Sequence, residues 1–425
     1  MPRVLANAFD PGFAEGDCAY HAVLVGRDGR VFFAVSTHRL DHHARLGCFD
    51  PASRKMRFVN DLGEALGESS TLAVPHGKVH VPIAEIDGHL YLATMQGHGG
   101  GDRRGRRPYP GFRLISVDPE SGRPTDVIHG PRGEGLVAGV MDGERRVYYG
   151  LTYPGGRFCR CDLRSGSLRV SGRPCADLPM AGRLRLQFVY PVCRSLGLDT
   201  DGAVYGSCRN GSIWRAEADQ KPRRLPGLNV RQGVVPPLDR QGARDGFWRT
   251  IVFDQEQGCF HGIHAGTQSL FRFDPARGRI DPLCRIGVEA LHDLPHAPFG
   301  SQLGLVLGPA RVLYHISHGP PVSIEGRPPV GSTAYLTSYD IDRGRFRQHG
   351  PIETDAGDRV LFAESLTVDT HGNLYALAGV EVSDPAERPR YRRLRAEAAP
   401  PVSQNEVYRM MLLRIGTETT GGASA

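Results

Sequence analysis

The chain has 425 residues, 40% of them hydrophobic, and its 54 glycines and 32 prolines favour a turn-rich all-β protein over a helical one. No run of about 20 apolar residues occurs, so we expect no membrane span, and no charged-then-apolar segment at the N-terminus indicates a secretory signal. The nine cysteines are scattered and include no CxxC pair, which predicts a reducing, cytoplasmic setting without a disulfide framework.

The net charge of +6 is carried almost entirely by arginine, since lysine occurs only at positions 55, 78 and 221. Two interpretations stay open: a compositional bias towards arginine, or a partner with carboxylates, which guanidinium groups bind in bidentate fashion. Acidic residues are interspersed among the basic ones, so we expect no nucleic-acid partner. Two basic runs, Arg103 to Arg107 and Arg388 to Arg395, are expected in solvated loop insertions.

One sequence pattern occurs seven times: an alternating apolar stretch, a turn with glycine, and a second apolar stretch with an aromatic anchor. The anchors are 59, 57, 57, 55, 54 and 61 residues apart, and they are Phe32, Tyr91, Tyr148, Tyr205, Phe260, Tyr314 and Tyr375. A strand repeat of this period predicts an all-β, seven-bladed β-propeller with four-stranded blades. We expect one domain over residues 1–416, with blades that start near positions 21, 80, 136, 194, 249, 302 and 364.

The second repeat shows the expected blade most clearly. His80 to Ile86 alternates as a first strand, and Asp87-Gly88 is a two-residue hairpin signal. His89 to Thr94 is the returning strand, and Phe112 to Asp118 is a third strand. The turn Asp118 to Gly122, in which aspartate caps the turn and glycine supplies a positive φ, leads into the outer fourth strand.

The last repeat has only three strands of its own. A propeller leaves no open sheet edge when its ring is completed, so Arg3 to Phe9 is expected to supply the outermost strand of blade seven. Residues 381–404 are polar and rich in proline and arginine, which predicts a loop insertion. Residues 417–425 predict a disordered tail.

The polar residues at equivalent blade positions are the candidate site. The start of a first strand and the end of a second strand share one mouth of the channel, so these side chains are expected to converge. The first-strand starts supply His21, His80, Arg194, Arg249, Gln302 and Glu364. The second-strand ends and a nearby loop supply His38, His98, Tyr153, Arg209, His264, His318 and Tyr190. Solvation accounts well for one polar residue at a propeller mouth, but poorly for a whole set.

Three kinds of group in this set suit β-elimination on a uronic acid. Arginine neutralises the carboxylate, histidine removes the proton next to it, and tyrosine protonates the leaving oxygen. We assign catalysis to His80, His98, Tyr190 and Arg194. We assign substrate binding to His21, His38, Tyr153, Arg209, Arg249, Gln302 and Glu364. A single carboxylate among them does not suit ordinary glycoside hydrolysis, which needs a pair.

A divalent metal is a further possibility. His264 and His318 are candidate ligands, with Gln268 as an additional one. Imidazole and amide ligands suit Mn²⁺ or Zn²⁺, and Ca²⁺ stays open as well.

With its blade repeat, its His80 and His98 and its Arg194 and Arg209, the chain resembles the seven-bladed β-propeller polysaccharide lyases, such as ulvan lyases and oligogalacturonate lyase. The ulvan-lyase pattern implies that two His, a Tyr and an Arg carry elimination, and Tyr190 is the nearest match for the Tyr. The oligogalacturonate-lyase pattern implies His ligands to Mn²⁺ in the late blades. Propeller lactonases, quinone-dependent enzymes and scaffolds share this strand pattern. The fold by itself therefore does not establish the function.

We therefore expect a carbohydrate-active lyase that acts on an anionic oligosaccharide or polysaccharide with uronic acid, and a small imported substrate fits the expected cytoplasmic location. Two alternatives stay open: a propeller hydrolase or isomerase for a small anionic molecule, and a non-catalytic binding scaffold. A scaffold presents its distinctive residues on the rim, whereas here they are expected at the axis.

Overall fold

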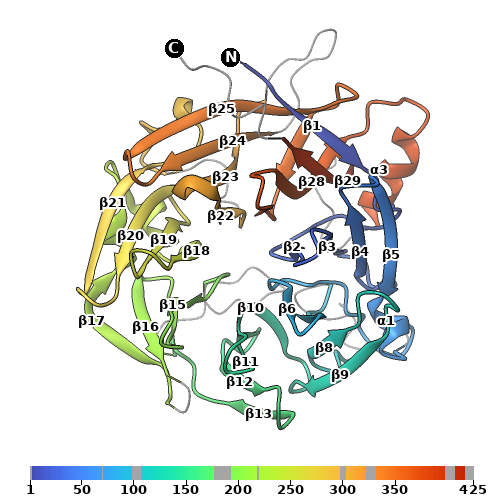
Figure 1. Cartoon of the computed structure of the whole chain (residues 1–425), viewed down its shortest axis with the longest axis horizontal. Helices are drawn as coiled ribbons and strands as arrows, with labels where there is room; N and C mark the ends of the chain where they lie inside the picture. The colour runs from blue at the N-terminus through green and yellow to red at the C-terminus, as the bar shows by residue number, and fades with distance from the viewer. Residues whose placement is uncertain are drawn as a thin grey trace.

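The computed structural model of the chain describes residues 2–68, 70–97, 107–176, 193–217, 220–296, 303–321, 332–397 and 407–416. These residues form sheets arranged around a central axis (Figure 1). Five sheets have four strands each, and a 9-stranded sheet contains two further blades that strand β1 joins. The predicted seven-bladed β-propeller with four-stranded blades is confirmed.

The first three blades follow one another in chain order, with the first strand of each nearest the axis. Blade one contains β2 (Val23–Val25), β3 (Val31–Val35), β4 (Arg45–Asp50) and β5 (Lys55–Asp61). Blade two contains β6 (Ala84–Ile86), β7 (His89–Ala93), β8 (Arg113–Val117) and β9 (Pro124–His129). Blade three contains β10 (Gly135–Asp142), β11 (Val147–Tyr153), β12 (Phe158–Asp162) and β13 (Ser167–Val170).

The next three blades repeat this order. Blade four contains β14 (Gly197–Leu198), β15 (Val204–Ser207), β16 (Ser212–Ala216) and β17 (Arg223–Asn229). Blade five contains β18 (Trp248–Asp254), β19 (Cys259–His264), β20 (Ser269–Asp274) and β21 (Arg279–Arg285). Blade six contains β22 (Leu305–Leu307), β23 (Val312–Gly319), β24 (Thr333–Asp340) and β25 (Arg345–Thr354).

Blade seven closes the ring with a strand from the other end of the chain. Its inner strand is split into β26 (Val360–Ala363) and β27 (Thr367–Val368), followed by β28 (Leu374–Glu381) and β29 (Tyr408–Ile415). Strand β1 (Val4–Phe9) pairs antiparallel with β29 and also runs parallel to β25 of blade six. The expected closure by the N-terminal strand is confirmed, and the buried side chains of Val4 and Ala6 hold this strand in place.

Short helices connect some of the strands. The α-helices are α1 (Leu62–Ala65), α2 (Arg240–Arg244) and α3 (Arg388–Ala396), and the 3₁₀ helices are η1 (Val230–Gly233), η2 (Glu289–Leu291) and η3 (Pro309–Arg311). In the described ranges, none of the helices has the length and apolar character that a bilayer crossing requires.

The insertion at 381–404 differs from the expected loop, because Arg388–Ala396 forms helix α3. Tyr391 is buried in a small apolar cluster with Val382 and Val407. The Arg395 guanidinium donates hydrogen bonds to the carbonyl oxygens of Tyr408 (3.2 Å) and Ala14 (3.0 Å). These tertiary contacts stabilise a helix that the arginine-rich sequence of the segment did not predict. Residues 398–406, the tail 417–425 and Arg103 to Arg106 of the other basic run lie outside the described residues.

The expected turn after the third strand is present in blade two. The Asp118 carboxylate accepts hydrogen bonds from the backbone N–H groups of Glu120 (2.9 Å) and Ser121 (2.7 Å). Gly122 closes the turn at φ +67°, and a Cβ there would lie 2.5 Å from the carbonyl oxygen of Val59. Glycine is therefore required both by the backbone conformation and by the neighbouring blade.

The aromatic anchors form the centre of the apolar packing between blades. Phe32, Tyr148, Tyr205, Phe260 and Tyr375 are buried, whereas the other two anchors keep partial exposure. The rings of Tyr205 and Phe260, from neighbouring blades, have centroids 5.2 Å apart. Buried aromatic side chains remove the most apolar surface per residue, so the repeat that reveals the fold in the sequence also stabilises it.

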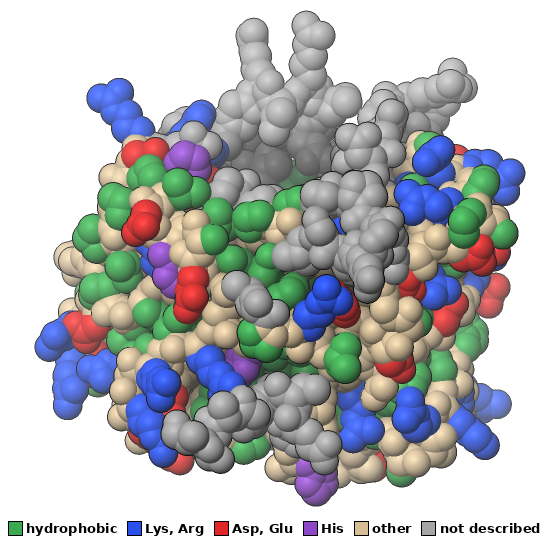
Figure 2. Space-filling model, turned by 90° about the horizontal axis from the view of Figure 1, so that it is seen from above, with side chains coloured by type: hydrophobic (Ala, Val, Ile, Leu, Met, Phe, Trp, Pro, Cys, Tyr) green, Lys and Arg blue, Asp and Glu red, His purple; other side chains and the backbone are tan. Residues whose placement is uncertain are grey.

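The outer surface mixes the two signs of charge. On the face that Figure 2 shows, basic and acidic side chains lie intermingled. Arg311 is one example, since its guanidinium contacts Asp254 (2.7 Å), Glu256 (2.8 Å) and Asp342 (2.8 Å). Arginine side chains of this kind are matched by carboxylates within the protein itself.

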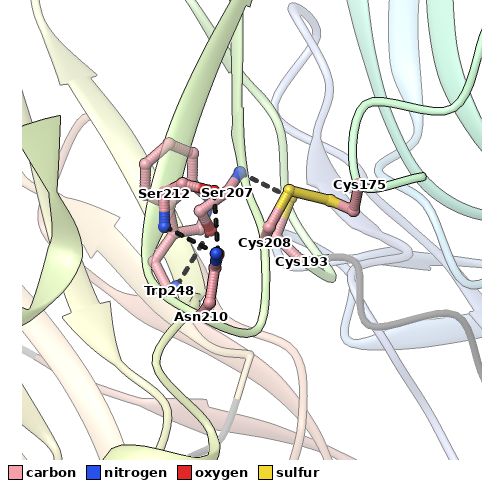
Figure 3. Close-up of a disulfide and its surroundings, with 7 residues drawn as sticks. All are labelled: Cys175, Cys193, Ser207, Cys208, Asn210, Ser212 and Trp248. Carbon is pink, nitrogen blue, oxygen red and sulfur yellow. Dashed lines mark hydrogen bonds between the residues drawn. A yellow bond between two sulfur atoms is a disulfide. The ribbon is translucent and has the colours of Figure 1, made fainter. Parts of the chain in front are cut away.

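The cysteines require a correction. Cys175, which follows the last strand of blade three, forms a disulfide with Cys208 of blade four, and Cys193 lies close by in the same apolar cluster (Figure 3). Spacing along the chain gave no sign of this bridge, because the two cysteines are 33 positions apart and meet only through the fold. The other seven cysteines are free. Disulfides persist mainly in oxidising compartments, and the predicted cytoplasmic location stays a prediction.

Candidate functional site

The innermost strands share an irregularity at the position of the candidate residues. Between the Cys18–Ser36 bridge and the Val23–Phe33 pair, the first strand of blade one advances five residues while its partner advances three. In blade five the register shifts between Trp248 and Thr250. Bulges of this kind re-aim side chains and are frequent next to functional sites.

Several candidate residues lie at such interruptions of the inner-strand pairing. Arg249 is the extra residue in the bulge of blade five, and Glu364 lies in the interruption between β26 and β27. His80 lies between the Lys78–Met95 bridge and the start of β6. The chain thus places its polar residues where the regular ladder of the inner strand is interrupted.

We call His21, His80, Arg194, Arg249 and Glu364 the axial cluster. One Arg249 nitrogen lies 3.5 Å from a carboxylate oxygen of Glu364. The charge of Arg249 also acts on His21, His80 and Arg194. Five residues that are up to 343 positions apart in the sequence, from 21 to 364, are therefore electrostatic neighbours.

Both imidazoles of the axial cluster are neutral at pH 7. Burial, helped by the nearby Arg249, lowers the pKa of His21 to about 3. Burial and the charge of Arg194 hold the pKa of His80 well below its usual value. A neutral imidazole accepts a proton, so both rings have the protonation state of a general base.

The axial cluster contains more positively charged groups than negatively charged ones. Burial raises the pKa of Glu364, although Arg249 opposes the shift, and burial together with Arg249 lowers the pKa of Arg194. Among the described residues Arg194 has no ion pair, and Arg249 pairs only with Glu364. Two guanidinium groups therefore share at most one carboxylate, an arrangement that an incoming anion would stabilise.

Several polar atoms of the cluster are buried without a hydrogen-bond partner. They are Nε2 of His21, Nδ1 of His80, Nε of Arg249 and one carboxylate oxygen of Glu364. Most buried polar atoms in proteins are hydrogen-bonded, and exceptions concentrate where a ligand or water binds. Similar atoms occur elsewhere in the propeller, but these four belong to one electrostatic cluster, which favours a polar ligand at the axis.

Two neighbours of the cluster were missed in the sequence. The ring of Tyr20 stacks on that of His80, with centroids 4.0 Å apart, and the Lys78 ammonium lies 5.3 Å from the Tyr20 ring centroid. Tyr20 directly precedes the predicted strand start at His21, and Lys78 is one of three lysines in the chain. The scarcity of lysine was the available signal for Lys78.

The predicted binding residues Tyr153 and His38 lie at the edge of the cluster. Tyr153 is buried at the end of β11, and the charge of Arg194 acts on it. Nδ1 of His38 forms a hydrogen bond of 2.9 Å with the Asp17 carboxylate. Burial and the charge of Lys78 lower the pKa of His38. His38 is thus connected to the axial cluster through Lys78.

Arg209 was assigned to substrate binding, and in the structure it contacts residues of a neighbouring helix. Its Nε donates a hydrogen bond to the Arg244 carbonyl oxygen (2.9 Å) and lies 3.4 Å from Asp245. Both partners belong to helix α2 and its C-terminal end. Arg209 therefore anchors this helix, which its position after a second strand did not reveal.

His264 and His318, the expected metal ligands, each have cationic neighbours, and the metal site stays a prediction. His264 lies 3.1 Å from the Thr267 hydroxyl, near Arg231 and Arg285. His318 lies near His315 and Arg249. Cationic neighbours oppose the binding of a metal cation. The assigned residues His98, Tyr190 and Gln302 lie outside the described residues.

Two other groups of side chains within the described ranges have metal-ligand character. In one of them, Asp254, Cys259 and His261, the Asp254 carboxylate is already bound by Arg311. The other is Asp17, Cys18 and His38. The donor set of carboxylate, thiol and imidazole fits Zn²⁺ best, but burial and the Asp17 charge raise the pKa of Cys18 well above its usual value. The cations Lys78 and Arg395 act on the same group, so its fit to a metal is poor.

Comparisons with known proteins agree on the fold. No family model matches the chain, and no curated protein matches it. Among solved structures, it is similar to the WD40 repeats of RRP9, at 11% identity and a TM-score of 0.54 over 98% of this chain and 99% of that one. It is also similar to U3-55K, at 10% identity and a TM-score of 0.53 over 97% and 99% of the two chains.

A third similar structure is the extracellular domain of the putative hybrid two-component system BT4673 from B. thetaiotaomicron, at 13% identity and a TM-score of 0.52. The match covers 96% of this chain and 39% of that one, so this chain spans well under half of that protein. The fold is a β-propeller. At these identities the comparisons show the fold alone, and they do not bear on the resemblance to lyases.

Proposed function

We propose that the chain is a carbohydrate-active lyase that cleaves an oligosaccharide containing uronic acid by β-elimination at the axial cluster. One observation carries the proposal: Arg194 and Arg249 lie beside two neutral imidazoles, and among the described residues only Glu364 pairs with either guanidinium. This is an environment for a carboxylate next to a proton acceptor.

The arginines supply the activation in this proposal. The proton on C5 of a uronate is only weakly acidic, because the adjacent carboxylate is negative. Arg194 and Arg249 would bind that carboxylate and stabilise the charge that develops on it when the proton leaves. Their partial burial strengthens the effect, since less water screens the interaction.

His80 is the proposed base and Tyr20 the proposed acid. His80 takes the proton from C5, the electron pair of that C–H bond forms the C4–C5 double bond, and the C4–O bond breaks. The leaving oxygen takes a proton from the Tyr20 hydroxyl. Burial keeps the pKa of Tyr20 well above its usual value, so the phenol is protonated and able to donate. Tyr20 stands in for the Tyr190 of the sequence prediction.

The burial of the site favours a short substrate. His80 is only 5% exposed. A site this enclosed suits the end of a small anionic oligosaccharide better than the middle of a polymer. The proposed chemistry uses side chains alone, so activity is expected without added Mn²⁺ or Ca²⁺.

The test is an assay of the purified chain on a panel of uronic-acid oligosaccharides. Elimination creates a conjugated C4–C5 double bond that absorbs near about 235 nm, so an increase at this wavelength reports the reaction directly. A matched control is Arg311→Ala, whose arginine pairs with three carboxylates away from the axial cluster. Constant absorbance across the panel, with and without Mn²⁺ or Ca²⁺, would contradict the proposal. New reducing ends without absorbance would indicate a hydrolase instead.

A further inference from the structure

Lys78 differs from the other two lysines of the chain. It is 7% exposed, whereas Lys55 and Lys221 are exposed on outer parts of blades one and four. Almost every other cation is arginine, which retains its proton in proteins and cannot act as an amine. A lysine at a buried position of an arginine-rich chain suggests chemistry that arginine cannot perform.

The backbone holds Lys78 firmly at the edge of the axial cluster. Its N–H donates to the Met95 carbonyl oxygen (3.0 Å), and Met95 returns the bond (2.8 Å). The preceding Gly77 accepts a hydrogen bond from the Thr37 N–H of blade one (2.7 Å). A Cβ at Gly77 would lie 2.7 Å from the carbonyl oxygen of Thr37, so blades one and two meet closely there.

The ammonium of Lys78 lacks a strong partner in the described part of the chain. It makes no hydrogen bond or ion pair there, and it lies over the face of the Tyr20 ring, 5.3 Å from the ring centroid. Burial lowers the pKa of Lys78, and the charge of Arg194 acts in the same direction, while Cys18 and Asp17 oppose it. His38 and His80 are the other titratable groups that Lys78 influences.

We propose that Lys78 is a nucleophilic amine that forms an imine with the carbonyl carbon of a 2-oxo acid whose carboxylate is bound by Arg194. The inference uses the same carboxylate-binding arginine as the proposed function, but it does not require elimination to take place. It assigns the site a second class of ligand, in which a ketone or aldehyde lies directly beside the carboxylate.

The step balances without an oxidant or a reductant. The neutral Nζ of Lys78 attacks the carbonyl carbon, and the oxygen takes up a proton to give a carbinolamine. Nitrogen then loses its remaining protons as the hydroxyl group leaves as water, and the C=N bond forms. His80, which is neutral and is influenced by the charge of Lys78, is the proposed relay for these protons.

The experiment traps the imine on the full chain. The protein is incubated at pH 7 with pyruvate and sodium cyanoborohydride, digested, and analysed by mass spectrometry for the reduced adduct at each lysine. Lys55 and Lys221 serve as internal controls. We expect Lys78 to be labelled at least about tenfold faster than either control, because its lowered pKa leaves more neutral amine and Arg194 holds the carbonyl of pyruvate beside it. Lys78→Arg removes the adduct.

A second variant tests the role of the carboxylate. Arg194→Gln should reduce pyruvate labelling of Lys78 at least about tenfold, the size expected when one charged hydrogen bond is lost. Labelling of the same lysine by formaldehyde, which has no carboxylate, should fall by a smaller factor, because it reports only the rise in the pKa of Lys78 when the Arg194 charge is removed.

Equal labelling of all three lysines, or none at Lys78, would overturn the inference. Pyruvate labelling that is unchanged in Arg194→Gln would also overturn it, because binding by Arg194 would then play no part. Trapping at Lys78 by a protein that is silent on uronic acids would remove only the proposed function, and the reverse result would remove only the imine.

Discussion

Two histidines four residues apart have opposite environments. His76 has both ring nitrogens satisfied, by the Tyr109 hydroxyl (3.0 Å) and by the Glu68 carboxylate (2.9 Å). His80 stacks on Tyr20, and its Nδ1 is buried without a partner. The His76 ring is therefore fully hydrogen-bonded, whereas the His80 ring keeps one unsatisfied nitrogen. Burial alone therefore does not distinguish a structural histidine from a candidate ligand-binding one, and the hydrogen-bond partners of the ring have to be considered as well.

The largest effect is expected for His80→Ala. If His80 is the base, its removal should slow the elimination by about 1,000-fold, within the usual range for a general base. The melting temperature should stay the same or rise, because an unsatisfied buried group is removed. Initial rates at about 235 nm and a thermal melt of the same samples provide the measurement. A rate within about twofold of the parent would exclude His80 as the base.

Arg194→Ala tests the charge imbalance of the axial cluster. We expect a loss of about 100-fold in rate, equivalent to about 2.7 kcal/mol, because the developing charge loses its main counterion. Arg311→Ala is the matched control, since it removes a satisfied arginine and should lower stability rather than the rate. If both variants affected the rate alike, the distinction between paired and unpaired arginines would fail.

Glu68→Gln should lower the stability of the fold and leave the rate almost unchanged, unlike Arg194→Ala. The change removes the charge that His76 and Arg113 both contact, and it leaves a weaker acceptor in a buried network. We expect the free energy of unfolding to fall by about 1–3 kcal/mol, measured by urea denaturation, with little change in kcat. A large loss of kcat at unchanged stability would show that the network belongs to the active site.

The pH dependence of stability reports the protonation state of His21. The pKa of His21 falls to about 3 in the folded chain, against about 6.5 when unfolded, so the unfolded state binds one more proton between these values. Its contribution to stability is complete above about pH 6.5 and is lost as the pH falls towards 3. His21→Gln should therefore reduce the slope of unfolding free energy between pH 4 and 6 by about 1.4 kcal/mol per pH unit. Urea titrations at several pH values provide the check, and an unchanged slope would show that His21 is charged when folded.

The amino-acid sequence determined the architecture because the repeat is a local pattern. Alternating strands, glycine turns and aromatic anchors are legible along each stretch of chain, and the closing strand Arg3 to Phe9 follows from the one strand that blade seven lacks. The convergence of His21, His80, Arg194, Arg249 and Glu364 could also be anticipated, because equivalent positions of seven blades share one axis.

Only the tertiary structure decided which polar residues are satisfied. Arg209 and Arg194 are equally plausible in the sequence, but one binds helix α2 and the other has no ion pair in the described part of the chain. The Cys175–Cys208 bridge and helix α3 likewise depend on contacts between distant segments. The physical reason is that a charge, a thiol or an imidazole acquires its pKa and its partners from whatever the fold places within a few ångströms, and local sequence patterns do not encode those distances.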